Sequence, residues 1–404
     1  MSLLHAFLAW RSWRAIGTGL PDFSIFYTAG EILHEKHGYE LYDDRVQEAV
    51  QRSFSPIGLQ KRGSILPFNH PPFEALVFVP FARLSYINAY LVWFGINLGL
   101  TFAVVVLLRR NFVILGRAPF YLWMLTGFGF YPLFLALIQG QDSILVLFCY
   151  TMAFLAFRRG FELGEGAWVG LGLCKFHLVL AFIVPLILLR RKKFLAGFFS
   201  VALLLALLGL AAVGWKGCLS YPSYVIASEN NPSYFWNSFI GHAANVRGVV
   251  ESLCPPEYPH LRIGLILVVC LMLLAALTYA ARKAFRTTAV YPELVFALSL
   301  IATVLVSYHM LAHDMTILLL AALVVLEVLL SSQMLQGWSR RALLVCIGIL
   351  FCTPVYILFA LRYQRSELLG AVLLVFFVVL FVEFLRIQPK VDAPTALLTD
   401  PELH

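Results

Sequence analysis

Long apolar runs separated by short basic clusters are the feature that most limits how this chain can fold. Several runs reach the roughly 20 residues that an α-helix needs to cross the hydrocarbon core of a bilayer. Hydrophobic residues make up 61% of the 404 residues and charged residues only 13%, whereas soluble proteins contain about 45–50% apolar and about 25% charged residues. The sequence therefore predicts an all-α, polytopic integral membrane protein.

Nine apolar runs are predicted to cross the membrane as helices, although the third is short for a full crossing. Before the first of them, Pro71–Leu84 is short and interrupted by Pro80, which predicts an interfacial or partly inserted helix. The nine runs are Tyr86–Leu108, Ala118–Ile138, Ile144–Phe157, Phe194–Val213, Ile263–Ala280, Val290–His309, Met315–Leu330, Ala342–Ala360 and Leu368–Leu385.

Clusters of Lys and Arg between these runs set the predicted topology, because cytoplasmic loops carry an excess of both residues. They also explain the formal net charge of +8 without a nucleic-acid partner. The clusters assigned to the cytoplasm are Arg109-Arg110, Arg158-Arg159, Arg190-Arg191-Lys192-Lys193, Arg282-Lys283 with Arg286, Arg340-Arg341, and Arg386 with Lys390.

One further apolar run, Gly166–Leu189, conflicts with a simple crossing. It lies between two of the basic clusters and would be about 36 Å long as a helix at ~1.5 Å per residue. Both clusters stay on one side only if the run turns back inside the membrane. We therefore predict two half-helices that meet near Cys174–His177, with Lys175 near the middle. Irregular backbone at that depth must line a cavity or be buried in protein.

This topology divides the chain into three parts. Residues 1–85 form an N-terminal segment and an external polar loop with interfacial helices, residues 86–386 form the helix bundle with an external loop at 214–261, and residues 387–404 form a cytoplasmic tail. The apolar stretch Leu3–Trp10 is too short to cross alone. Either it lies along the interface, or the chain starts later than related chains do.

Polar residues that could carry chemistry converge on the predicted external face. Each has a structural alternative: Asp22 precedes the helix predicted at Phe23–Glu35 and could simply cap it, and Lys175 could reach the interface with its long side chain. The candidates are Asp22, His70, Gln139, Gln141, Asp142, Lys175, His177, Asn237, His242, Asn245, His309, His313 and Asp314.

Three smaller features leave alternatives open. His309 and His313 with Asp314 occur at helical spacing, which fits either a metal site or polar caps of two spans. Gln139–Asp142 is equally consistent with a plain hairpin turn. Cys218 and Cys254 share a polar loop and could pair in an oxidising space. Because neither a CxxC nor an HExxH pattern is present, the sequence indicates no zinc site. We also expect no other metal and no cofactor.

Several short motifs follow one another in an informative order. They are Asp22 followed by Phe26-Tyr27, Gly38-Tyr39-Glu40-Leu41-Tyr42-Asp43, Phe68-Asn69-His70-Pro71-Pro72 with Pro80, Gly140-Gln141-Asp142, Lys175, Arg190-Arg191-Lys192-Lys193, and Asn237-Ser238. Together, from roughly Asp22 to Leu330, they resemble glycosyltransferase family 87. Asp142 stands where this resemblance predicts Asn.

The resemblance implies a GT-C-like bundle of about 10–12 transmembrane or half-membrane helices with a large first external loop. It also implies a sugar donor carried on polyprenyl phosphate, an active site on the external side of the plasma (bacterial inner) membrane, and mannosyltransferase-like activity. Asp22 would be the general base. Lys175 would lie near the donor phosphate, and the remaining substrate-binding candidates are His177, His70, Gln141, Asp142, Asn237, His309, His313 and Asp314.

The resulting hypothesis is an inverting membrane glycosyltransferase that moves a hexose or pentose to a lipid or glycan acceptor. Its partners would be the lipid-linked donor, the acceptor and the membrane. The alternative is a polytopic transporter or flippase without catalysis, although no convincing internal repeat favours it. A third interpretation is a polysaccharide polymerase or ligase that uses a diphosphate-linked donor.

Overall fold

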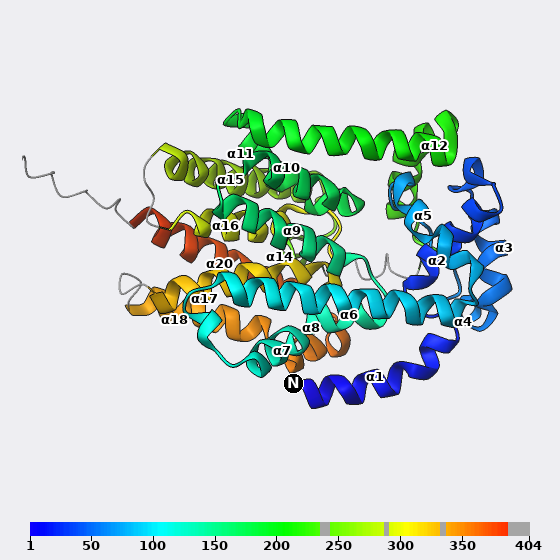
Figure 1. The fold of residues 1–404 in the computed structure, drawn as a ribbon, viewed down its shortest axis with the longest axis horizontal. Coiled ribbons are helices and arrows are strands. Elements are labelled where there is room, and N and C mark those ends of the chain that lie inside the picture. The colour runs from blue at the N-terminus through cyan, green and yellow to red at the C-terminus, as the bar shows by residue number, and fades with distance from the viewer. Residues whose placement is uncertain (235–242, 287–290, 332–336, 387–404) are drawn as a thin grey trace, which may run out of the picture.

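The computed structural model describes residues 1–234, 243–286, 291–331 and 337–386. Within these ranges the regular structure is entirely helical (Figure 1). This confirms the predicted all-α polytopic architecture. Two hydrophobic cores hold the chain together: a small one under the N-terminal segment and a large one inside the helix bundle.

The N-terminal segment folds into short helices rather than an open loop. Helix α2 is its centre, as predicted for Phe23–Glu35, and it packs against α5 and α3. Gly30 permits this packing, because a Cβ atom there would lie 2.4 Å from the carbonyl oxygen of Phe78. The elements are α1 (Ser2–Gly17), α2 (Phe23–His34), η1 (Gly38–Glu40), α3 (Asp44–Phe54), α4 (Pro56–Arg62), α5 (Pro72–Phe78) and η2 (Val79–Arg83).

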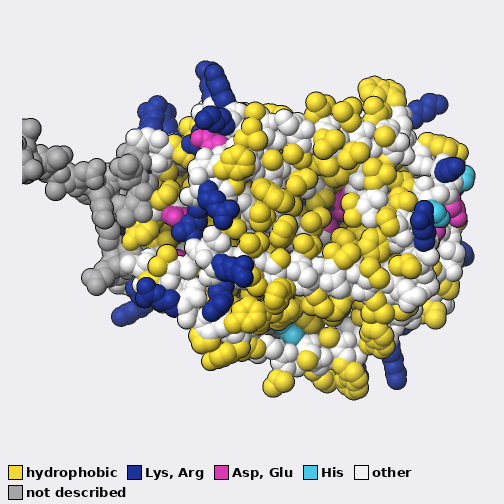
Figure 2. All heavy atoms as spheres, in the orientation of Figure 1, with side chains coloured by type: hydrophobic (Ala, Val, Ile, Leu, Met, Phe, Trp, Pro, Cys, Tyr) yellow, Lys and Arg dark blue, Asp and Glu magenta, His cyan; other side chains and the backbone are white. Residues whose placement is uncertain are grey.

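Five apolar helical stretches are long enough to cross a membrane. They are α6 (Tyr86–Asn111), α12 (Lys192–Asn230), α15 (Pro259–Arg286), η5 (Ala312–Ile317) continuing into α17 (Leu318–Ser331), and α20 (Glu367–Arg386). Two shorter apolar helices, α9 (Ser143–Arg158) and α16 (Glu293–Val306), complete the bundle. Helices α12 and α15 leave most of their apolar side chains exposed. Figure 2 shows hydrophobic side chains across the middle of one face, with Lys and Arg toward its two ends.

Two predicted spans, Ala118–Ile138 and Ala342–Ala360, are not single helices. The first is α7 (Phe120–Gly129) followed by α8 (Tyr131–Gln139) at a 67° bend, and the second is α18 (Gly337–Leu350) followed by α19 at a 69° bend. In each, a proline lies in the first turn of the second helix, where it starts a helix well but cannot continue one. The remaining elements are η3 (Leu115–Arg117), α19 (Thr353–Tyr356) and the π-helical η6 (Ile357–Arg362).

The predicted turn within the run Gly166–Leu189 is confirmed. Helix α10 (Glu162–Leu171) leads into η4 (Gly172–Leu178), and α11 (Leu180–Leu188) leaves at a bend of 119°. The backbone departs from helical geometry at Lys175, with φ −109° and ψ 68°. Glu162 and Arg191, at the two outer ends of the turn, form a 2.8 Å ion pair. The chain therefore enters and leaves on the same side of the bundle.

Most of the basic clusters lie at the end of the bundle where the chain enters and leaves the turn at η4. Arg191 stacks 3.8 Å from the ring of Phe285 near the end of α15, and Lys283 donates to the carbonyl of Leu385 near the end of α20. Arg158, at the end of α9, donates to the carbonyl at the end of α6 and pairs with Glu293 at 3.6 Å. These contacts confirm the grouping of the clusters on which the topology prediction depends.

The predicted external loop at 214–261 is largely helical. Helix α12 continues to Asn230 and only kinks at Gly214, whose φ of 69° no other residue type adopts easily. Helix α14 (Val246–Leu253) follows. Cys218 and Cys254 lie in this region, and both are free thiols in the structure. The predicted pairing alternative is therefore not realised.

Candidate active site

A cavity of about 430 Å³ lies where the N-terminal segment meets the bundle. Its walls come from the start of α2, the end of α4, the segment before α5, the turn at η4 and the chain leading into η5. Most of the predicted site residues meet here. The acidic, basic and histidine side chains that line it are Asp22, Lys61, Arg62, His70, Lys175, His177, Glu229, His309 and His313.

Asp22 occupies the N-cap position of α2 but does not cap it with its side chain. Instead, Oδ2 accepts a 2.7 Å hydrogen bond from Nε2 of Gln141, while the backbone N–H of Asp22 donates to Oε1 of Gln139 at 3.2 Å. The side chain is 22% exposed. Among the described residues, no donor contacts Oδ1. The capping alternative is therefore wrong, and the carboxylate faces the cavity with one oxygen held and one available.

Lys175 does not reach toward the interface, because its ammonium is buried among three acceptors. The Nζ atom lies 2.8 Å from Oδ1 of Asp314, 3.1 Å from Oδ1 of Asp142 and 3.2 Å from Oε1 of Gln141. The side chain is only 4% exposed. Asp314 and Gln141 accept hydrogen bonds from the ammonium, and Asp142 forms an ion pair with it. The snorkelling alternative is wrong, because three protein oxygens surround the ammonium inside the protein.

Gln141 connects the buried ammonium to the carboxylate on the cavity wall. Because its Oε1 accepts from Lys175, its Nε2 must point the other way, toward Asp22. The turn that carries it is fixed by Gly140, whose φ is 64° and where a Cβ would lie 2.7 Å from the side chain of Phe23. Trp93 also donates to the carbonyl of Gly140 at 2.8 Å. The hairpin turn of the sequence is thus a rigid support for Asp22.

His313 and Asp314 close the other side of this network. The ring of His313 lies between two carboxylates, with Nδ1 3.9 Å from Oδ2 of Asp22 and Nε2 3.5 Å from Oδ1 of Asp314. These two residues begin the 3₁₀ segment η5, whereas His309 lies before it in irregular chain. The expected helical face that all three would share is therefore not formed.

His309 belongs to a second polar group on the cavity wall. Its Nδ1 lies 3.1 Å from Oε2 of Glu229, and Asn69 donates to the other oxygen of Glu229 at 3.3 Å. Burial alone would lower the pKa of His309, but the hydrogen bond to Glu229 and its charge outweigh that effect and raise it. The ring of His177 lies 5.8 Å from that of His309. Sequence reasoning missed Glu229, which follows no motif.

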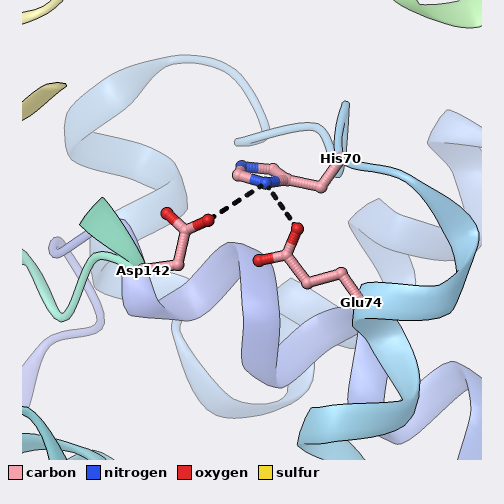
Figure 3. Close-up of side chains that lie close together, drawn as sticks. All are labelled: His70, Glu74 and Asp142. Atoms are coloured by element: carbon pink, nitrogen blue, oxygen red, sulfur yellow. Dashed lines mark hydrogen bonds and ion pairs between the residues drawn. The ribbon is translucent and has the colours of Figure 1, made fainter. Parts of the chain in front are cut away.

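His70, Glu74 and Asp142 form a third group (Figure 3). The Nδ1 atom of His70 lies 2.9 Å from Oε2 of Glu74 and 3.9 Å from Oδ2 of Asp142. Burial, with a smaller contribution from the charge of Asp142, outweighs the attraction of His70 and raises the pKa of Glu74 to about 7. These are metal-ligand types, and their candidate ligand atoms lie within 4.8 Å of one another. Sequence reasoning missed Glu74, although it follows His70 at i+4 spacing in an apolar helix.

The other candidates do not reach the cavity or lie outside the described residues. Asn245 caps α14, accepting from Gly248 at 2.9 Å and donating to Ser307 at 2.6 Å, and so has a structural role. Asn237 and His242 lie outside the described residues. Arg62 was missed: it lines the cavity and donates to the carbonyl of Gly19 at 2.8 Å.

The bundle and the buried acid–base network beside a cavity define a polytopic membrane protein built around a polar site. The family model of glycosyltransferase family 87 matches residues 68–308, more than half of the chain, so this protein belongs to glycosyltransferase family 87. It is a multi-pass membrane glycosyltransferase, which sets the transporter alternative aside. His70, Gln141, Asp142 and Lys175 lie inside the matched range. Asp22 and the segment from His309 onward lie outside it.

Two other comparisons add nothing to this assignment. No curated protein matches the chain, and no solved structure matches it either.

Proposed function

We propose that this protein transfers a mannose-like hexose or a pentose from a polyprenyl-phosphate donor to a lipid or glycan acceptor, with inversion, on the external side of the plasma membrane. The position of the cavity supports this sidedness. The basic clusters gather at the end of the bundle where the chain enters and leaves the turn at η4, and such clusters favour the cytoplasm. The cavity lies at the inner side of that turn, away from the clusters, and is therefore assigned to the external side. Apolar surface on α12 and α15 suits a protein whose substrates are held in the bilayer.

Asp22 is the general base in this proposal. The acceptor hydroxyl loses its proton to the carboxylate, its oxygen bonds to the anomeric carbon, and the bond from that carbon to the phosphate oxygen breaks. The leaving group departs as polyprenyl phosphate, which needs little protonation. The observation that carries this role is the cavity-facing carboxylate of Asp22, with Oδ2 held by Gln141 at 2.7 Å and no described donor on Oδ1.

Lys175 is a positioning residue in this proposal rather than a phosphate ligand. Its ammonium already lies within 3.2 Å of oxygens of Asp142, Asp314 and Gln141, and the two carboxylates beside it would repel a phosphate. It supports catalysis by fixing the amide of Gln141 and hence the carboxylate of Asp22. The other cations that could meet the donor phosphate are on the cavity wall, where Lys61, Arg62 and His309 lie.

The test is transfer by the purified chain in liposomes, with several radiolabelled polyprenyl-phosphate sugars offered to a membrane lipid extract as acceptor. Asp22→Asn should lower the rate by about 10²–10⁴-fold, the usual contribution of a general base. Asp43→Asn is the matched control, because Asp43 is an N-terminal acid that caps α3 and Asn caps equally well. Transfer by Asp22→Asn at the control rate would remove Asp22 from the mechanism.

A further inference from the structure

We infer that His70, Glu74 and Asp142 form a binding site for one divalent metal ion, of the Mn²⁺ or Zn²⁺ type, at the wall of the cavity. The three side chains come from two different elements and point toward one another in Figure 3. His70 and Glu74 lie before and within α5, and Asp142 lies at the start of α9.

The distances suit a small cation after minor side-chain rotation. A metal bound at about 2.0–2.2 Å from each ligand places the ligand atoms roughly 3–3.5 Å apart. The observed separations from His70 Nδ1 are 2.9 Å to Glu74 and 3.9 Å to Asp142. All three candidate ligand atoms lie within 4.8 Å of one another.

Unsatisfied oxygens point to a missing cation at this place. Glu74 is 3% exposed and Asp142 is 1% exposed. Within the part of the chain that the structure describes, Oε1 of Glu74 and both carboxylate oxygens of Asp142 are buried without a hydrogen-bond partner. Buried carboxylate oxygens normally have one or more donors or a metal. A cation between the two carboxyl groups would give these oxygens a partner.

The balance of charge supports the same conclusion. Two buried carboxylates, those of Asp142 and Asp314, contact one permanent cation, Lys175, and the buried carboxyl group of Glu74 contacts His70. Lys175 binds Oδ1 of Asp142 at 3.1 Å, which leaves Oδ2 on the side of His70. One carboxylate can therefore serve the ammonium and the metal at once.

The ligands are held in place before any metal binds. Pro71 and Pro72 fix the backbone after His70, and Tyr42 donates to the carbonyl of His70 at 2.9 Å. The imidazole packs edge-on against Phe26 at 4.9 Å between ring centroids. A site supported in this way loses little freedom on binding.

The ligand set indicates which metal fits. One imidazole and two carboxylates suit Mn²⁺ or Zn²⁺ better than Ca²⁺, which prefers six to eight oxygens. Three protein ligands leave at least one coordination position open, and His70 lines the cavity. The open position can take a phosphate oxygen of the donor, whose approach the carboxylates would otherwise oppose. This last role rests on the proposed function, whereas the metal site does not.

The binding test uses the full chain purified in detergent, stripped with EDTA and titrated with MnCl₂, with free Mn²⁺ measured by electron paramagnetic resonance. The native chain should bind one Mn²⁺. His70→Ala and Asp142→Asn should each weaken binding by at least about 100-fold, more than the loss typical of an outer-shell change. His37→Ala is the matched control, because His37 pairs with Glu40 at the same 2.9 Å distance on the surface and should bind as the native chain does.

Thermal unfolding separates lost binding from lost folding. Mn²⁺ should raise the unfolding midpoint of the native chain and of His37→Ala, because a ligand of the folded state stabilises it, and should leave that of a folded Asp142→Asn unchanged. Zn²⁺ is tested in the same way. Absence of binding by the native chain, or equal binding by Asp142→Asn, would overturn the metal site. If Mn²⁺ binds but sugar transfer by the stripped chain needs no added metal, the metal site is confirmed and its proposed contact with the donor phosphate is wrong.

Discussion

The cavity wall around Asp22 and the charge cluster behind it around Lys175 use the same kinds of side chain in opposite ways. Asp22 is 22% exposed and has one carboxylate oxygen without a described donor. Lys175 and Asp314 are 4% and 0% exposed, and three protein oxygens lie within 3.2 Å of the ammonium. Asp22 on the wall can still accept a hydrogen bond or a proton from a substrate, whereas the charged groups around Lys175 are already in contact with one another.

This difference assigns different tasks to the two regions. A group that will accept a proton needs an open position facing the substrate. A group that fixes the position of a catalytic side chain needs a complete set of contacts and little conformational freedom. Changes to the cluster should therefore act first on folding, and changes to the wall first on activity, with Gln141 between them.

The largest effect on stability is expected from Lys175→Met. Removal of the ammonium leaves two buried carboxylates, Asp142 and Asp314, without the permanent cation that they share. Breaking a buried ion pair by removing one partner costs about 3–5 kcal/mol. The variant should show a markedly lower thermal unfolding midpoint in detergent, and a smaller folded fraction after purification.

The matched control for this change is Lys192→Met, which removes an exposed lysine at the start of α12. It should shift the midpoint little, since surface substitutions usually stay within about 0.5 kcal/mol. Lys175→Met in combination with Asp314→Asn should recover part of the loss. A Lys175→Met protein as stable as the control would mean that the cluster does not hold the fold.

Gln141→Ala tests the link between the two regions. It should leave most of the stability intact, because the ammonium keeps both carboxylates, but it removes the 2.7 Å hydrogen bond that orients Asp22. Misplacement of a reacting group by about 1 Å can cost about 10²-fold in rate. The expected result is a fall in kcat of that order with little change in KM for the donor, measured in the liposome assay.

The split between kcat and KM decides the role of Gln141. A residue that only binds substrate would change KM. Gln139→Ala is a useful comparison, because its 3.2 Å contact is to the backbone of Asp22 rather than to the carboxylate, and its effect should be smaller. If Gln141→Ala raised KM alone, Gln141 would be a substrate ligand and not a positioning residue.

Much of the bundle could be predicted because its pattern is local. Apolar length identified the spans, and the basic clusters on both sides of Gly166–Leu189 required a turn that the structure places at Lys175. The bends after Gly129 and Leu350 were not predicted. A run that is apolar on every side carries no periodicity, and a single proline within it ends one helix or starts another with equal ease.

The site was predictable only as a set of residues on one face. Asp22, Gln141, Lys175 and Asp314 were all selected, but their pairing was not, because Lys175 and Asp314 lie 139 positions apart in the chain. The donor-phosphate role assigned to Lys175 rested on the cost of a charge in an apolar run. A buried ammonium needs a partner of opposite charge, but that partner can belong to the protein as well as to a substrate. In the structure the partners are two carboxylates of the protein.

The smallest expected effect concerns His309 and Glu229, the second pair on the cavity wall, and it appears as a pH dependence. The pair raises the pKa of His309. A raised histidine pKa adds stability that is fully present below the unfolded value of about 6.5 and is lost as pH rises through the folded-state value. The unfolding midpoint of the native chain should therefore decline in the window above pH 6.5. Glu229→Gln removes the charge that raises the pKa of His309, so the decline should become smaller, while the part due to the raised pKa values of His70 and Glu74 remains.

Addition of His309→Asn to the Glu229→Gln variant separates this pair from the other histidines of the cavity. Once the carboxylate is gone, His309 contributes no raised pKa, so the double variant should have the same pH profile as Glu229→Gln. Persistence of the native decline in the double variant would assign it to another group. It would also mean that groups closer to Lys175, and not His309 on the cavity wall, cause the loss of stability with rising pH.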